Sequence, residues 1–268
     1  MNILLIYPQY PDTFWSFKHS LRFISKKAAF PPLGLLTVAA MLPYGWRKKL
    51  VDLNVEPLSD EQLAWADMVF LSAMIVQKES ARQIIQRCRA HGKKVVAGGP
   101  VFTTQHERFE GVDHFILNEA EITLPLFLKD LAAGQPKPLY TSEERPYITR
   151  TPVPLWSLID IKNYATMAIQ YSRGCPFNCE FCDIIIMNGR IQRVKSPTQM
   201  QKEFQALFDA GWRLGIVSKA RFRYWKLIVK TFFVKREALP IAVELAIHGF
   251  HFEKILKRVC RPLNYQTK

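Results

Sequence analysis

Three cysteines stand close together in the second half of the chain and could bind a metal centre. Cys175, Cys179 and Cys182 are separated by three and then two residues, and Gly174 and Pro176 suit a tight loop around them. A four-iron cluster is normally held by four thiolates, but no fourth Cys or His lies close to this loop. Spacing and ligand count therefore predict an iron–sulfur cluster with one iron open to a small chelating molecule.

Two simpler interpretations of these thiols are a structural zinc site and three ordinary buried side chains. Structural zinc usually takes four Cys or His ligands. The later candidates are His248, His251 and Cys260, and even His248 lies 66 residues beyond Cys182. The iron–sulfur interpretation is therefore favoured over zinc.

The Cys-x3-Cys-x2-Cys spacing also resembles the signature of the radical S-adenosylmethionine (SAM) enzymes. In that family SAM fills the open corner of a [4Fe–4S] cluster, and reduction of the cluster cleaves SAM to a deoxyadenosyl radical. The resemblance implies that Cys175, Cys179 and Cys182 hold the cluster. It also implies that Phe181, the aromatic residue before the third Cys, lies beside SAM.

The residues ahead of the loop have the pattern of a parallel sheet flanked by helices. Strand-like apolar runs lie at residues 3–7, 50–55, 68–73, 94–97 and 114–117, and helices are expected at 33–42, 60–66, 78–91 and 122–132. Gly92 is expected to end the third helix. We predict an α/β fold with a doubly wound parallel sheet, whose ligand crevice lies beyond the carboxyl ends of the strands.

Distinctive residues follow the predicted strands and would meet at that crevice. The candidate cofactor contacts are Tyr7, Pro8, Gly98, Gly99, Glu119 and Glu121. Adjacent glycines let a backbone approach a large flat ligand closely, although ordinary turns explain a Gly-Gly pair at least as well.

This domain resembles the cobalamin-binding domain of the cobalamin-dependent radical SAM enzymes, in the branch that includes the hopanoid methylase. The matching stretches are residues 11–17, 30–35, 97–100 and 118–121. The resemblance implies cobalamin as a cofactor and methyl transfer to an unactivated carbon of a lipid-like substrate. Many such domains supply an axial His from Asp-x-His-x-x-Gly, but none of the six His here lies in that pattern. The lower face of cobalamin would be empty or met by another group. The alternative to a cobalamin-binding role is that the sheet domain is retained only as a folding or docking module.

The chain after the sheet departs from the family. A Pro-rich linker around 134–154 precedes an expected strand at 166–171. A helix is then expected at 198–210, with Pro197 at its start and Gly211 at its end. A complete barrel takes about 250 residues, but 86 residues follow Cys182 and include one further strand-like run, 214–217. Most of the barrel is therefore missing.

Residues from 214 onward resemble the C-terminal extension of the same branch, which implies an internal deletion near 212–214. The expected domains are 1–140 (cobalamin-binding-like), 141–160 (linker), 161–213 (radical SAM barrel fragment) and 214–268 (basic helices). Because family contacts to SAM come from missing strands, activity is left open. The alternative function is an inactive remnant that keeps a cobalamin-binding or docking domain and membrane-associating helices.

The last part of the chain is strongly basic. Residues 212–268 carry 13 Lys and Arg against 3 Asp and Glu, in a chain with a net charge of +14. Two amphipathic helices are expected there, which would bind a membrane surface or dock on the protein itself. The positive charge would also attract nucleic acid, but no recognisable motif supports that partner. The remaining expected partners are a small-molecule or lipid-like substrate and an electron donor for the cluster.

Composition bounds the class of protein. The chain of 268 residues is 49% hydrophobic, which suffices for a sizeable core. The first residues lack the basic leader of a signal peptide, and no apolar run approaches the ~20 residues of a spanning helix. Clustered cysteines fit a reducing compartment. We therefore expect a cytoplasmic protein that associates with membranes only peripherally.

Overall fold

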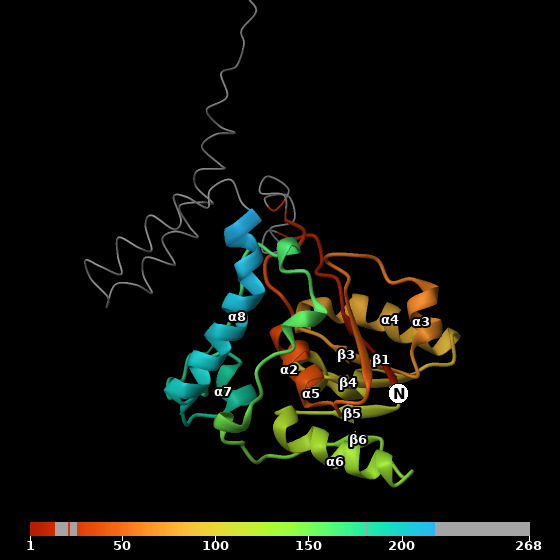
Figure 1. Ribbon diagram of the computed structural model, residues 1–268. Helices are drawn as coiled ribbons and strands as arrows, with labels where there is room; N and C mark the ends of the chain where they lie inside the picture. The colour runs from red at the N-terminus through yellow and green to blue at the C-terminus, as the bar shows by residue number, and fades with distance from the viewer. Residues whose placement is uncertain (14–20, 22–25, 181, 218–268) are drawn as a thin grey trace, which may run out of the picture.

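The computed structural model describes residues 1–13, 21, 26–180 and 182–217 (Figure 1). Six strands form one parallel sheet in the order β2-β1-β3-β4-β5-β6. The strands are β1 (Asn2–Tyr7), β2 (Arg47–Asp52), β3 (Met68–Ser72), β4 (Lys94–Gly98), β5 (His114–Ile116) and β6 (Leu139–Tyr140). The helices of this domain are α2 (Leu33–Met41), α3 (Asp60–Trp65), α4 (Lys78–Ala90), α5 (Pro100–Gln105) and α6 (Ala120–Ala132). The predicted doubly wound α/β fold is confirmed.

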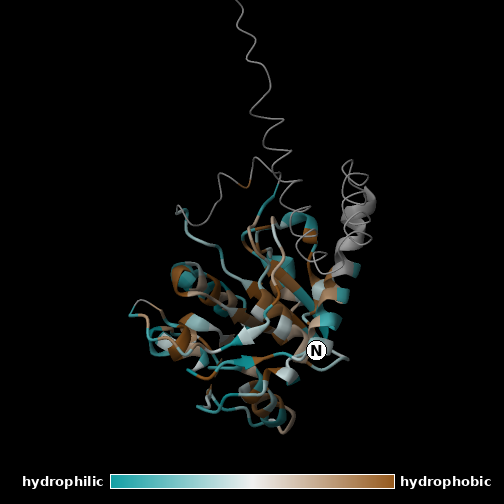
Figure 2. Ribbon diagram, turned by 90° about the vertical axis from the view of Figure 1, so that its left-hand side faces the viewer, coloured by the Kyte–Doolittle hydropathy of each residue, from teal (hydrophilic) through white to brown (hydrophobic). Residues whose placement is uncertain are grey.

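The side chains of β1 divide the core into two layers. Leu4 and Ile6 pack with α3, α4 and α5 on one face, whereas Ile3 and Leu5 pack with α2 and α6 on the other. All four are fully buried. A parallel strand reads as a continuous apolar run because both of its faces are covered. Figure 2 shows hydrophobic residues gathered at the centre of this domain.

The predicted elements of the sheet agree with the structure in type and order, with three differences. The strand predicted at 50–55 lies too far along the sequence, because β2 is Arg47–Asp52. Helix α5 was not predicted. Strand β6 lies inside the predicted Pro-rich linker, where the backbone N–H of Phe115 bonds the Pro138 carbonyl. Gly92, at φ 62°, follows α4 directly after His91, as expected.

The segment between β6 and the cysteine loop packs against the sheet domain. Its short 3₁₀ turns are η4 (Ile148–Arg150), η5 (Trp156–Leu158) and η6 (Ile161–Asn163). Trp156 is 5% exposed and joins the core layer of α2 and α6. Tyr164 pairs with Ala28 in an isolated parallel bridge, and its hydroxyl donates to Asp52 at 3.1 Å. This segment therefore adds to the core, unlike a free linker.

The region of the cysteine loop has a different architecture from the expected barrel unit. Strand β7 (Ser172–Arg173) pairs with β8 (Arg193–Val194) in an antiparallel two-stranded sheet, and α7 (Ile184–Asn188) lies between them. Helix α8 (Pro197–Val217) follows. The strand predicted at 166–171 is wrong, because these residues form no ladder with a neighbouring strand. The strand-like run 214–217 is also wrong, because α8 continues through Gly211 to its end.

Some predictions are not decided by the described residues. The amphipathic helices expected after residue 217 lie outside the described residues. The boundaries at 140, 160 and 213 stay predictions, although α8 crosses the last of them without interruption. None of the helices built from the described residues has the length and apolar character needed to cross a bilayer.

Candidate functional site

The loops after the parallel strands meet at one edge of the sheet, which we call the carboxyl edge. Tyr7 ends β1 there, and its hydroxyl lies 2.7 Å from the hydroxyl of Tyr10. The Pro8 carbonyl accepts bonds from the side-chain amides of Gln77 and Asn54. Burial, reinforced by Tyr10, raises the pKa of Tyr7 above its ordinary value. Tyr7 therefore presents a neutral phenol that can only hydrogen-bond.

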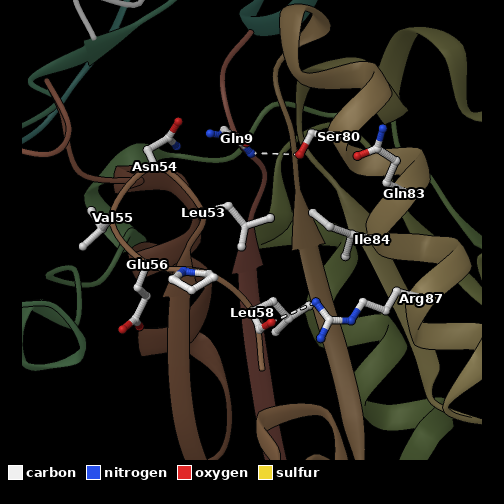
Figure 3. Close-up of a pocket in the computed structure, with 11 residues that line it drawn as sticks. Gln9, Leu53, Asn54, Val55, Glu56, Leu58, Ser80, Gln83, Ile84 and Arg87 are labelled. Atoms are coloured by element: carbon white, nitrogen blue, oxygen red, sulfur yellow. Dashed lines mark hydrogen bonds between the residues drawn. The ribbon is translucent and has the colours of Figure 1, made fainter. Parts of the chain in front are cut away.

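A cavity of about 510 Å³ adjoins this edge, between the loop after β2 and helix α4 (Figure 3). The Gln9 backbone N–H donates to the Ser80 hydroxyl at 3.0 Å on one side, and Arg87 donates to the Leu58 carbonyl at 2.8 Å on another. The lining residues are Gln9, Leu53, Asn54, Val55, Glu56, Pro57, Leu58, Ser80, Gln83, Ile84 and Arg87. None of the predicted cofactor contacts is among them, so this cavity lies beside the predicted crevice.

The two glycines at the end of β4, Gly98 and Gly99, are required by the fold itself. A Cβ on Gly98 would lie 2.7 Å from the Ile116 carbonyl oxygen on the neighbouring strand. Gly99 has φ +91°, and its Cβ would lie 2.6 Å from the Ser72 hydroxyl. Close backbone packing therefore accounts for both residues, as the turn interpretation expected. They still leave the carboxyl edge free of side chains at this point.

Exposed apolar residues follow β3 at the same edge. Met74, Ile75 and Val76 are 43%, 41% and 60% exposed. An apolar cluster of this kind can contact the flat face of a large ligand. The sequence analysis did not select these three residues, because short apolar runs also occur in cores.

The remaining two predicted contacts, Glu119 and Glu121, lie in an ion-pair cluster after β5. Glu119 accepts from Arg173 Nη1 at 2.7 Å and from Arg193 Nη2 at 2.7 Å. Glu121 pairs with Arg173 Nη2 at 2.8 Å and accepts from the Thr151 hydroxyl at 2.7 Å. The cluster therefore joins the carboxyl edge of the sheet to the two strands that enclose the cysteine loop.

The carboxylates of this cluster face arginine side chains. Burial alone would raise the pKa of Glu121, but the bonds from Arg173 and Thr151 outweigh it and hold that pKa below its ordinary value. The same carboxylates raise the pKa of Arg173 despite its burial. Both groups are consequently ionised near neutral pH.

The cysteine loop spans the residues between β7 and β8. The Cys175 N–H bonds the Gly189 carbonyl at 3.1 Å, and the Cys182 N–H bonds the Cys179 carbonyl at 3.1 Å. Cys179 is exposed, Cys175 and Cys182 are half-buried, and all three are free thiols. Among the described residues, His, Cys, Asp and Glu side chains do not gather in a group of three that could hold a metal ion. Phe181 lies outside the described residues.

Comparisons with known proteins find two matching family models and several similar proteins. Residues 22–128 match the B12 binding domain, and residues 180–264 match a domain of unknown function, DUF4070. An uncharacterized methyltransferase of Synechocystis is 44% identical over 81% of this chain, and the hopanoid C-2 methylase of Rhodopseudomonas palustris is 35% identical over 79%. A bacteriochlorophyllide d C-8(2)-methyltransferase of Chlorobaculum tepidum is 26% identical over 52% of the chain and 33% of its own length.

The chain therefore contains a B12 binding domain and is similar to the hopanoid C-2 methylase and to related methyltransferases. It spans 41% of the length of each of the first two relatives. Strands β2 to β5 of the sheet fall within the match to the B12 binding domain, so the carboxyl edge is the surface to compare with cobalamin.

The groups at the carboxyl edge are of a kind that could contact a large flat cofactor. This edge offers a bare backbone at Gly98 and Gly99, the exposed apolar residues from Met74 to Val76, and a neutral Tyr7 hydroxyl. The described histidines lie elsewhere. His114 begins β5 and its Nδ1 donates to the Lys137 carbonyl at 2.7 Å, and His91 caps the end of α4. His106 begins the turn after α5.

The cysteine loop fits an iron–sulfur cluster by its chemistry. Three soft thiol ligands lie within eight residues, and each is solvent-accessible to some degree. Arg173 and Arg193, which hold the ends of the loop, were not foreseen as functional. Their partners lie 54 and 74 residues away in sequence, and no local pattern links them.

Proposed function

We propose that this protein binds cobalamin at the carboxyl edge and a [4Fe–4S] cluster at Cys175, Cys179 and Cys182, and serves SAM-dependent radical methyl transfer. The cluster, when bound, would supply the electron that cleaves SAM. The methyl acceptor would be an unactivated carbon of a lipid-like molecule. The observation that carries the proposal is that the three-cysteine loop is held by ion pairs on the edge where a B12 binding domain holds its cofactor.

Each residue has a part in this proposal. The three thiols would hold the cluster, and Phe181 would lie beside SAM. The Tyr7 hydroxyl, the backbone at Pro8 and the bare glycines would contact cobalamin together with the apolar residues after β3. No His of the chain lies in an Asp-x-His-x-x-Gly pattern, so the lower face of cobalamin would be empty or met by another group.

The remaining parts of the proposal concern partners. An electron donor would reduce the cluster, and the basic residues beyond 217 would bring the protein to a membrane surface where a lipid-like substrate resides. Nucleic acid is not proposed as a partner. The protein would work in the cytoplasm, at the membrane periphery.

The test is anaerobic reconstitution with iron and sulfide, followed by EPR of the dithionite-reduced protein with and without SAM. A four-iron signal that changes when SAM is added supports the proposal. The Cys179→Ala variant should lose that signal, whereas Cys88→Ala, which removes a buried thiol of the sheet core, should keep it. Cobalamin binding is followed separately by its visible absorption.

A second candidate function is an inactive remnant that retains the cobalamin-binding or docking domain. It is favoured by the described residues after Cys182, which pass through α7 and β8 into α8 without a further parallel strand. A reconstituted protein that binds cobalamin but gives no cluster signal, or gives one indifferent to SAM, would select this candidate.

A further inference from the structure

Glu119 occupies the centre of the ion-pair cluster between the sheet and the cysteine loop. Its Oε2 accepts from Arg173 Nη1 at 2.7 Å and from Arg193 Nη1 at 3.0 Å, and its Oε1 accepts from Arg193 Nη2 at 2.7 Å. The Glu121 oxygens are engaged by Arg173 and by the Thr151 hydroxyl. All four carboxylate oxygens are therefore occupied by groups of this chain.

The two arginines stand opposite each other at the base of the loop. Arg173 in β7 and Arg193 in β8 are paired residues of the antiparallel ladder. Like charges directly opposite each other destabilise a strand pair. A ladder of two residues per strand is also too short to be stable alone. The base of the loop therefore depends on the carboxylates that neutralise both arginines.

Burial makes this dependence strong. The side chains of Arg173 and Arg193 are 12% and 13% exposed, and those of Glu119 and Glu121 are 5% and 7% exposed. Removing one partner of a buried pair leaves the other charge uncompensated, which costs far more than breaking a surface pair. Arg145, with its Nη1 at 3.9 Å from Glu119 Oε1, adds a third positive charge to the cluster.

We propose that Glu119 and Glu121 are positioning residues that close the base of the cysteine loop and fix it on the carboxyl edge of the sheet. This assignment differs from the sequence expectation that they contact the cofactor. The closure itself follows from the geometry of this chain, and its use in placing the three thiols next to cobalamin rests on the proposed function.

Trypsin provides the first test, because it cleaves after Arg. In the native protein without cofactors, Arg173 and Arg193 are tied to Glu119, whereas Arg190 in the same loop is exposed. Initial cleavage after each Arg is measured by mass spectrometry under single-hit conditions. For Glu119→Gln we expect cleavage after Arg173 and Arg193 to rise about tenfold relative to cleavage after Arg190.

The matched control is Asp60→Asn, which makes the same carboxylate-to-amide change. Asp60 bonds Arg87 at 2.6 Å, but its side chain is 71% exposed. This variant should keep the wild-type cleavage ratio, since exposed ion pairs contribute little. A Glu119→Gln protein that stays folded and keeps the wild-type ratio would overturn the proposal. So would a protein cleaved throughout the sheet, because that result indicates general unfolding.

A double variant tests directly whether Glu119 acts through Arg193. In Glu119→Gln/Arg193→Gln the uncompensated charge of Arg193 is removed. If the two residues act through each other, cleavage after Arg173 in the double variant should be no faster than in Glu119→Gln alone. If the increases in cleavage after Arg173 caused by Glu119→Gln and by Arg193→Gln simply add in the double variant, the proposed closure is wrong.

Cofactor binding separates the closure from the proposed function. Glu119→Gln should bind cobalamin like the wild type but retain less iron after reconstitution and gel filtration. If Glu119→Gln keeps its trypsin protection and loses cobalamin, Glu119 is a cofactor contact and the closure is wrong. If the wild type itself retains no iron while the trypsin result holds, the proposed function fails and the closure stands.

Discussion

Gly174, directly before the first cysteine, is the residue whose change should most sharply open the loop. Its φ is +89°, and a Cβ there would lie 2.2 Å from the Ile191 carbonyl oxygen. A residue with a side chain held in this conformation costs ~1–3 kcal/mol. The contact is with backbone, so no side-chain rotation relieves it, and the total for Gly174→Ala reaches roughly 2–5 kcal/mol.

That cost falls on the weakest part of the structure. The ladder of β7 and β8 has two residues per strand, whereas the six-stranded sheet has its own two-layered core. The loop base should therefore open locally while the sheet stays folded. We expect Gly174→Ala to raise the alkylation rates of Cys175 and Cys182 by maleimide about tenfold or more, with an unchanged circular dichroism melting curve of the sheet.

Two other glycines with positive φ separate the contact from the backbone strain. Gly189→Ala lies in the same loop at φ +78°, but its Cβ meets only the Arg145 side chain, at 3.4 Å. Gly134→Ala, at φ +74°, meets nothing within 4 Å. Thiol reactivity should rise strongly for Gly174→Ala, slightly for Gly189→Ala and not for Gly134→Ala. Equal effects at the first two positions would refute the reasoning from the contact with Ile191.

Three further predictions concern the sheet domain. Gly98→Ala should lower the free energy of unfolding in urea by about 2 kcal/mol, because its Cβ would meet the Ile116 carbonyl oxygen at 2.7 Å. Gly34→Ala in α2 has room for the added Cβ and should raise that free energy by about 0.5 kcal/mol. Phe127→Ala should cost about 3–5 kcal/mol in the same assay, because the ring is fully buried in the core. Burial raises the pKa of Asp52, so the wild type should lose stability as pH rises from about 4 to 7, and Asp52→Asn should remove that part of the loss.

The sign for Asp52 follows from linkage. A carboxyl whose pKa is raised by folding stabilises the protein below its unfolded pKa, and this contribution is lost as pH rises through the folded pKa. The difference in stability between Asp52→Asn and the wild type should therefore increase with pH. A difference that is constant between pH 4 and 7 would mean that the bonds from Asn54 and Tyr164 offset burial completely.

The sheet could be predicted from the sequence because its signals are local. Continuous apolar runs such as residues 3–7 indicate strands buried on both faces, and Gly92 marks a helix end. Strand β6 escaped prediction because two residues between prolines carry no periodicity. The run at 214–217 was misread because a short apolar run fits a strand and a helix equally well.

The candidate site could be predicted only in part. The cysteine spacing and the residues after each strand are visible in the sequence, but the bonds among them are not. Glu119 was expected to contact a cofactor, and its actual partners lie in a separate part of the chain. A buried ion pair between residues so far apart is a property of tertiary structure, so the sequence could indicate the acidic residues but not what they bind.

The ion-pair cluster holds the cysteine loop without the neighbouring parallel strands that a barrel would have. In a complete parallel barrel, neighbouring strands on both sides would hold the strand that leads into the loop. In the described part of this chain that strand has a single partner of two residues. Side chains must then position the cysteine loop, and we assign this role to Glu119, which lies in the B12 binding domain. The cysteine loop and the sheet therefore contact each other directly, and the Glu119 carboxylate lies at the centre of that contact.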